Sequence, residues 1–102
     1  MTMMIETMVS NSAQLVTLAC GVDGSSPQDI SPDEEGYLSL ELLQKSVGGY
    51  VELVAVPRFP NFVMVVNEEG ALRGMGFNRW ASLLAMRPIV GDVVVCDRCL
   101  LR

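Results

Sequence analysis

Seven side chains between residues 50 and 80 have the chemistry needed to bind a small anion such as a nucleotide. They are Tyr50, Glu52, Asn67, Arg73, Asn78, Arg79 and Trp80. The guanidinium of arginine contacts a phosphate in a bidentate manner, an aromatic ring stacks on a base, and Glu or Asn hydrogen-bonds to ribose hydroxyls. The sequence therefore predicts a ligand-binding site built from these residues.

The tripeptide Asn78-Arg79-Trp80 is the centre of this predicted site. Asn78 is a good helix cap, and the free backbone N–H groups at a helix N-terminus favour anions. The alternative is purely structural, with Asn78 as a cap only, Arg79 solvated and Trp80 in the core. Trp80, Leu83 and Leu84 have the spacing of one helix face, which is typical of core residues.

Cys96 and Cys99 form a CxxC pair, and Cys20 is the third cysteine. A structural zinc needs four ligands, and the sequence contains no histidine. A redox dithiol normally lies at a helix start, whereas this pair follows a predicted strand. We therefore interpret the thiols as structural and expect no metal and no cofactor, with metal binding and redox activity as the alternatives. Three cysteines, an odd count, favour a reducing cytoplasm over a disulfide scaffold.

The residues that catalysis usually requires are not arranged for it in this sequence. Without histidine there is no Ser–His or Cys–His couple. Glu68 and Glu69 are adjacent and would point to opposite faces of an extended chain, and Glu52 has no second acid at a suitable spacing. The glycines at 70, 74 and 76 lack the lysine of a phosphate-binding loop. We expect a protein that is not an enzyme.

The charge of the 102-residue chain is divided unevenly along its length. The net charge is −5, but residues 1–45 hold seven acids against one lysine, and residues 46–102 hold five acids against six arginines. This acidity makes nucleic acid an unlikely partner, whereas a small anion held by a few arginines is allowed. No apolar run reaches ~18 residues, and residues 1–12 do not resemble a secretory signal, so we expect no membrane association.

Hydrophobic periodicity and turn residues predict the elements that would position these side chains. Strands are expected over 14–20, 50–56, 62–66 and 93–96, a single helical turn near 31–34, a helix capped by Ser39 and ended by Gly48, and a second helix after Asn78. Val51, Leu53 and Ala55 are expected to form the core face of their strand. Residues 71–77 are expected to complete a hairpin with the strand before them.

Together these elements predict an α+β fold. We expect a small, mostly antiparallel sheet of four to five strands with one or two packed helices. The chain is expected to form a single domain over residues 1–102, with residues 1–12 flexible.

Several blocks of this sequence resemble a family found in phages and mobile elements, domain of unknown function 3846. The blocks are VGGYVE at 47–52, VNEEG at 66–70, Asn78, and VGDVVV at 90–95, and the resemblance extends from about Leu38 to Cys96. The resemblance implies a fold and a genomic setting but no chemistry, and we expect a location in the host bacterium's cytoplasm.

Two functional hypotheses follow from these observations. The first is a non-enzymatic phage or mobile-element protein that sequesters a small anionic ligand, such as a nucleotide immune signal of the host. The alternative is an acidic interaction protein that inhibits a host factor by direct binding, for example by mimicking the charge of DNA. In either case we expect a homo-oligomer, because a chain with 50% apolar residues would gain stability by burying one face.

Overall fold

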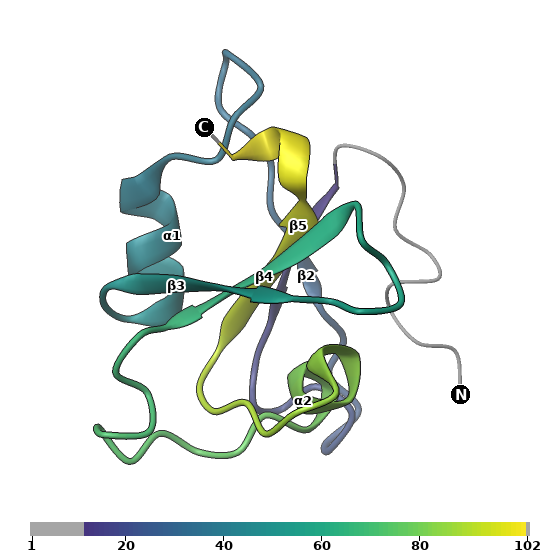
Figure 1. The fold of residues 1–102 in the computed structure, drawn as a ribbon, viewed down its shortest axis with the longest axis vertical. Coiled ribbons are helices and arrows are strands. Elements are labelled where there is room, and N and C mark those ends of the chain that lie inside the picture. Colours follow the sequence, from purple (N-terminus) through teal and green to yellow (C-terminus); the bar gives the residue numbers. More distant parts are fainter. Residues whose placement is uncertain (1–11, 102) are drawn as a thin grey trace.

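An antiparallel sheet of five strands, in the order β2-β1-β5-β4-β3, forms the centre of the structure, a computed structural model that describes residues 12–101 (Figure 1). The elements are β1 (Ala13–Val16), β2 (Gln28–Asp29), α1 (Leu40–Val47), β3 (Val51–Ala55), β4 (Phe62–Asn67), α2 (Arg79–Ala85), β5 (Val93–Asp97) and the 3-10 helix η2 (Arg98–Leu100). The predicted α+β fold with a mostly antiparallel sheet is therefore confirmed. All but the last residue of the expected flexible segment 1–12 lies outside the described residues.

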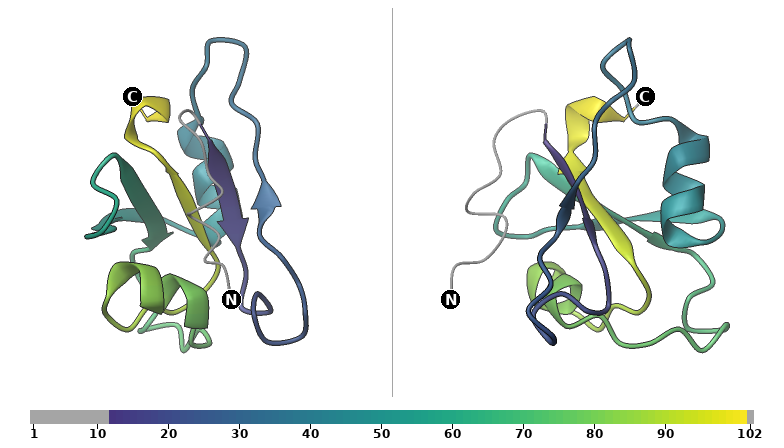
Figure 2. Two further views of the ribbon diagram at one scale, coloured as in Figure 1. Left: turned by 90° about the vertical axis from the view of Figure 1, so that its right-hand side faces the viewer. Right: turned by 180° about the vertical axis from the view of Figure 1, so that it is seen from behind.

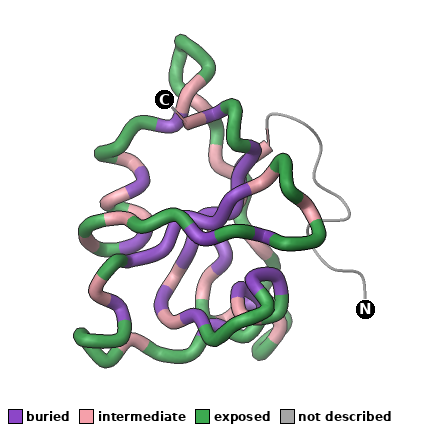
Figure 3. Tube along the Cα trace, viewed as in Figure 1, coloured by how far each residue is buried: buried purple, intermediate pink, exposed green. Residues whose placement is uncertain are grey.

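The two interior strands β4 and β5 carry apolar side chains on both faces, as their sequences predict. Every residue of β5 is buried, and in β4 only Phe62 is partly exposed (Figure 3). Strands covered on both faces need continuous rather than alternating apolar residues. The six valines of β4 and β5, at 63, 65, 66, 93, 94 and 95, are at most 7% exposed, so these strands form the buried centre of the sheet.

Alternate residues of the strands supply two separate cores, one on each face of the sheet. Met64 and Val93 pack with the apolar side of α2, whereas Val65 and Val94 pack with α1 and the residues around η2. Successive side chains of a strand point to opposite faces, so each strand contributes to both cores. Figure 1 shows the two helices well apart, with the strands crossing between them, and Figure 2 shows the same arrangement from the side and from behind.

Helix α1 begins and ends as the sequence predicts. The Ser39 side chain accepts a hydrogen bond from Leu42 N at 3.1 Å, and Gly48 ends the helix in the left-handed conformation with φ of 84°. Leu43 and Val47 are buried as expected, but Leu40, predicted for the same face, is 59% exposed. Leu40, the first residue of the helix, does not belong to the core that Leu43 and Val47 join.

Helix α2 also begins at its predicted cap, since the Asn78 side chain accepts a hydrogen bond from Ala81 N. Trp80 and Leu84 are buried, but Ala81 and Ala85 complete the packed face, and Leu83 is exposed. The predicted apolar face is therefore partly wrong. The helix ends at Ala85 because Met86 turns left-handed, which leaves Arg87 outside the last turn.

The structure corrects two predicted segments in which local turns replace regular elements. The residues expected to form a helical turn near 31–34 instead form a turn held by Asp33, whose Oδ1 accepts from the backbone N–H groups of Glu35 and Tyr37. Residues 68–74 form consecutive turns, so no strand pairs back on β4 to complete the predicted hairpin. The first predicted strand, 14–20, ends at Val16.

The predicted core face of β3 is also wrong. Val54 is buried, whereas Leu53 and Ala55 are exposed. β3 is an edge strand, and helix α2 with its neighbours covers the face to which Val54 points. On the other face α1 covers only Val51, and Leu53 lies beyond it.

Candidate functional site

Asn78, the centre of the predicted ligand site, has a structural role in which its side chain is hydrogen-bonded within the protein. Its side chain is fully buried, and its Nδ2 donates to Val16 O at 3.0 Å and Gly91 O at 2.9 Å, while its Oδ1 caps α2. An amide side chain offers two donors and one acceptor group, and protein atoms engage all of them. Asn78 therefore ties three segments together, and the structural alternative considered for it describes its role.

Trp80 is a core residue that packs against a glycine. It is 9% exposed, and a Cβ on Gly21, built at ideal geometry, would overlap the indole nitrogen. The indole N–H is buried and has no hydrogen-bond partner among the described residues. A buried ring in this setting has no free face for stacking on a base, whereas Arg79, one residue earlier, is exposed.

Asn67 and Arg73 bind the end of α1. Asn67 Nδ2 donates to Val47 O at 3.1 Å, and Asn67 Oδ1 accepts from Glu69 N at 2.7 Å. Arg73 donates to Gly48 O at 3.3 Å and lies 3.8 Å from the Glu69 carboxylate. A cation and an amide donor at a helix C-terminus satisfy carbonyls that the helix leaves unpaired. These two residues join α1 to the turns after β4.

Tyr50 and Glu52 remain at the surface near the start of β3. Tyr50 is 67% exposed, and Glu52 lines a small cavity of about 140 Å³ together with Asn67 and Arg87. The seven predicted residues therefore do not form one site. Asn78 and Trp80 are buried at the start of α2 and Arg79 is exposed there, Asn67 and Arg73 lie at the end of α1, and Tyr50 and Glu52 lie at the exposed start of β3. Sequence reasoning missed Arg87 as a neighbour of Glu52, because the two are brought together only by the fold.

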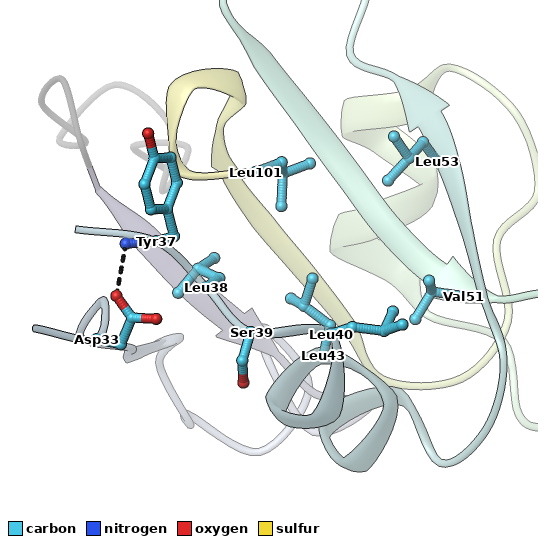
Figure 4. A pocket seen from close by; sticks show the side chains of 9 residues that line it. All are labelled: Asp33, Tyr37, Leu38, Ser39, Leu40, Leu43, Val51, Leu53 and Leu101. Carbon is cyan, nitrogen blue, oxygen red and sulfur yellow. Dashed lines mark hydrogen bonds between the residues drawn. The ribbon is translucent and has the colours of Figure 1, made fainter. Parts of the chain in front are cut away.

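A larger hollow than this cavity lies between α1, β3 and Leu101. It has a volume of about 410 Å³, and Figure 4 shows side chains from these elements converging around it. The residues that line it are Asp33, Tyr37, Leu38, Ser39, Leu40, Leu43, Val51, Leu53 and Leu101. We call this the leucine groove.

The leucine groove is apolar and bordered by acid. Five of its nine lining residues are leucines, one is a carboxylate, and none is basic. Glu34 and Glu41 are also exposed and lie one residue after Asp33 and in the first turn of α1, respectively. The loop that carries residues 33–36 projects away from the rest of the molecule (Figure 2). A groove of this kind suits apolar side chains flanked by positive charge.

The leucine groove could have been located from the leucines that the sequence pattern predicts to be buried but that no other element covers. Leu40 and Leu53 both satisfied an amphipathic pattern, and both are more than half exposed. Periodicity identifies the face on which an apolar residue lies but not whether another element reaches far enough to cover it.

The three cysteines lie in different surroundings. Cys20 belongs to the core beneath α2 and Cys96 to the core on the opposite face, and no disulfide joins any of the three cysteines. Within the described residues no group of three or more potential ligands could hold a metal ion. Burial, and then the neighbouring Asp97, raises the pKa of Cys96 to about 12, and a hydrogen bond with Asp97 raises the pKa of exposed Cys99. Both shifts disfavour the reactive thiolate.

Comparison with family models assigns most of the chain. Residues 20–99 match the model for domain of unknown function DUF3846. The chain belongs to the DUF3846 family. No curated protein and no solved structure matches it significantly.

In this DUF3846 chain, two sequence blocks that carried the resemblance are in direct contact. Asn67 of the VNEEG block binds the carbonyl of Val47 in the VGGYVE block, and Glu68 N donates to Tyr50 O at 2.8 Å. A Cβ on Gly49 would approach Asn67 Nδ2 to 3.0 Å, which explains a residue without a side chain there. The two blocks therefore form a structural joint between α1 and the sheet.

The DUF3846 match includes residues 33–53, which supply eight of the nine residues that line the leucine groove, whereas Leu101 lies beyond it. Among the helices that the structure describes, none has both the length and the apolar character needed to cross a membrane.

Proposed function

We propose that this DUF3846 protein is a non-enzymatic interaction protein that docks a partner protein in the leucine groove. The observation that carries the proposal is the groove itself: a hollow of about 410 Å³ in which Leu40 and Leu53 are 59% and 54% exposed. Contiguous exposed apolar surface with a polar rim is typical of protein–protein contact sites. Burying a fully exposed leucine is favourable by roughly 1.5–3 kcal/mol, so covering the exposed part of each of these side chains contributes about half of that.

The charge around the groove supports a partner with basic residues. Asp33, Glu34 and Glu35 follow one another in the projecting loop, and Glu41 stands in the first turn of α1. Opposite charges at the rim of an interface increase the association rate and favour correct partners. In the phage or mobile-element setting that the family resemblance implies, the partner would be a cytoplasmic host protein, and the acidic loop would occupy a surface that otherwise meets DNA.

Capture of a small anion, such as a nucleotide immune signal, is the second candidate. It is supported by the small cavity in which Glu52 and Asn67, two of the predicted ligand residues, meet the cation Arg87. Equilibrium dialysis against a nucleotide library tests this candidate. Retention of a nucleotide that Arg87→Ala abolishes and Arg79→Ala preserves would favour it over protein docking.

Affinity capture from host lysate with a matched pair of charge variants tests the main proposal. The chain offers two adjacent glutamate pairs, Glu34 with Glu35 beside the groove and Glu68 with Glu69 after β4. E34Q/E35Q and E68Q/E69Q remove the same charge, and Asp33 is left in place because it holds its turn. We expect one lysate protein to be retained by the wild type and by E68Q/E69Q but largely lost from E34Q/E35Q.

A bait that retains no protein would contradict the proposal, and so would equal retention by both double variants. The formation of a homo-oligomer stays a separate prediction. Light scattering at micromolar concentration tests it, and a purely monomeric mass would refute it.

A further inference from the structure

The outer edge of β3 presents backbone hydrogen-bonding groups that no described residue uses. β3 is the last strand of the sheet and pairs only with β4, in a register that sets Glu52 opposite Val66 and Val54 opposite Met64. Tyr50 O accepts a hydrogen bond from Glu68 N, so Tyr50 and Glu68 form a hydrogen-bonded pair. The next pair along the two strands is Val51 opposite Asn67. Hydrogen-bonded and non-hydrogen-bonded pairs alternate along an antiparallel ladder, so Glu52 and Val54 direct their backbone groups to β4.

The same alternation directs the backbone N–H and C=O groups of Val51, Leu53 and Ala55 to the open edge. These three residues have their side chains on the α1 face, and Val51 and Leu53 line the leucine groove. The free hydrogen-bonding edge and the apolar hollow are therefore formed by the same residues. Figure 4 shows Val51 and Leu53 on one strand, facing the same hollow as Leu40, Leu43 and Leu101.

A strand added to this edge would satisfy both features at once. Alternate side chains of a strand point to one face, so every second residue of an added strand would lie over the α1 face and reach the groove. Recognition by strand addition takes affinity from main-chain hydrogen bonds and specificity from pockets for alternate side chains. A long, unprotected edge is otherwise a liability that soluble proteins cover or blunt.

We propose that the partner of the leucine groove is an extended segment that pairs with the outer edge of β3, inserts apolar side chains at every second position and carries Lys or Arg between or beside them. This inference rests on the proposed function and specifies how the docking occurs. Charge complementarity selects the basic segment, because Glu34 adjoins Asp33 of the groove lining, Glu41 follows Leu40 in the first turn of α1, and Glu52 lies on β3 between Val51 and Leu53. It also disfavours a second copy of this chain, whose β3 would bring the same acidic residues to the contact.

Amide hydrogen exchange of the full chain, followed by NMR, tests the proposal residue by residue. The probe is a seven-residue synthetic peptide of alternating lysine and valine, compared with two twins N-methylated at its odd or its even positions. In the free protein we expect the amides of Val51, Leu53 and Ala55 to exchange quickly and those of Glu52 and Val54 slowly. The unmodified peptide should slow the first three by about tenfold or more at saturation and leave the other two unchanged.

Two further comparisons separate strand addition from simple apolar docking. The twin methylated at the positions that face β3 should bind about tenfold or more weakly, because it lacks the donors, while the other twin should bind as the unmodified peptide does. Leu53→Asp should weaken binding of every peptide, whereas Leu83→Asp, an exposed leucine on α2, should not.

Each remaining outcome decides against the inference in a recognisable way. Peptide-induced shifts at Leu40, Leu43 and Leu101 without protection of the three amides would overturn strand addition and leave docking in the groove intact. No shift at any of these residues would also overturn it, while the lysate experiment judges the proposed function independently. Protection of the three amides in the free protein that increases with its concentration would identify the occupant as a second copy and refute the basic partner.

Discussion

The two faces of the sheet differ in how completely they are closed. On the α2 face, Trp80, Ala81, Leu84 and Ala85 pack over the strands, and Asn78 ties the helix to two neighbouring segments. On the α1 face, the core is complete over β4 and β5 but stops short of Leu53, where the leucine groove opens. One face is therefore a finished core, and the other ends in a surface that a partner can cover.

Several residues predicted for the ligand site and several predicted for the core have exchanged their expected roles. Asn67, Asn78 and Trp80, which the sequence suggests for ligand binding, are used to close the fold. Leu40 and Leu53, which the sequence suggests for the core, are left exposed. The buried amides of Asn67 and Asn78 are hydrogen-bonded within the protein, whereas exposed apolar groups cluster where a contact is still to be formed.

The largest expected loss of stability comes from removing the N-terminal cap of each helix in turn. Asn78→Ala leaves Val16 O, Gly91 O and Ala81 N without their partner inside the protein, and we expect a loss of about 3–5 kcal/mol in the free energy of unfolding. Ser39→Ala removes one exposed cap of α1 and should cost about 1 kcal/mol. Urea denaturation measures both. Equal losses would show that the two faces are closed to the same degree.

A smaller difference in stability is expected between variants of two neighbouring residues of β3 whose side chains point to opposite faces of the sheet. Val54→Ala should cost about 2 kcal/mol because it opens space in the finished core, where Val54 is 4% exposed. Leu53→Ala should cost less than about 0.5 kcal/mol, because its side chain is largely in water. The same urea titration checks the pair. A loss at Leu53 as large as that at Val54 would mean that the groove is already filled by the protein itself.

The smallest expected change in stability is a pH dependence caused by the Cys96 thiol on the α1 face. Burial raises the pKa of Cys96 from 9.0 to about 12, so the folded state holds this proton more tightly than the unfolded state does. The resulting stability is fully present below pH 9 and is lost as the pH rises toward 12, and at pH 10 we expect a loss of about 1 kcal/mol. The decline between pH 9 and 12 should be shallower in Cys96→Val than in the wild type.

Alkylation provides a second measure of the same thiols. At pH 8 iodoacetamide should label Cys99 first, because it is the exposed cysteine, and only slowly, because its raised pKa keeps the thiolate fraction low. Mass spectrometry before and after addition of urea reports the order of labelling. Labelling of Cys96 as fast as Cys99 in the native protein would show that the core beneath α1 is open.

Local chemistry made much of the fold predictable. Ser39, Gly48 and Asn78 act at helix ends through contacts within a few residues of the chain, and a run such as 62–66 is apolar on both faces wherever it lies in a sheet. The predictions failed where an element's neighbours decide its environment. Residues 71–77 carry hairpin signals, but after β4 the chain turns back to the end of α1, where Asn67 and Arg73 find carbonyl partners.

The sequence by itself determined the antiparallel α+β fold, the helix caps, the interior strands and the division of charge between the two parts of the chain. Only the tertiary structure decided which apolar residues remain exposed and which polar residues are buried. Leu53 is exposed because β3 is the edge strand and α1 ends its coverage at Val51, and Asn78 is buried because Val16, 62 residues away, lies against it. Periodicity records the direction of a side chain, whereas burial depends on segments distant in the sequence that fold over it.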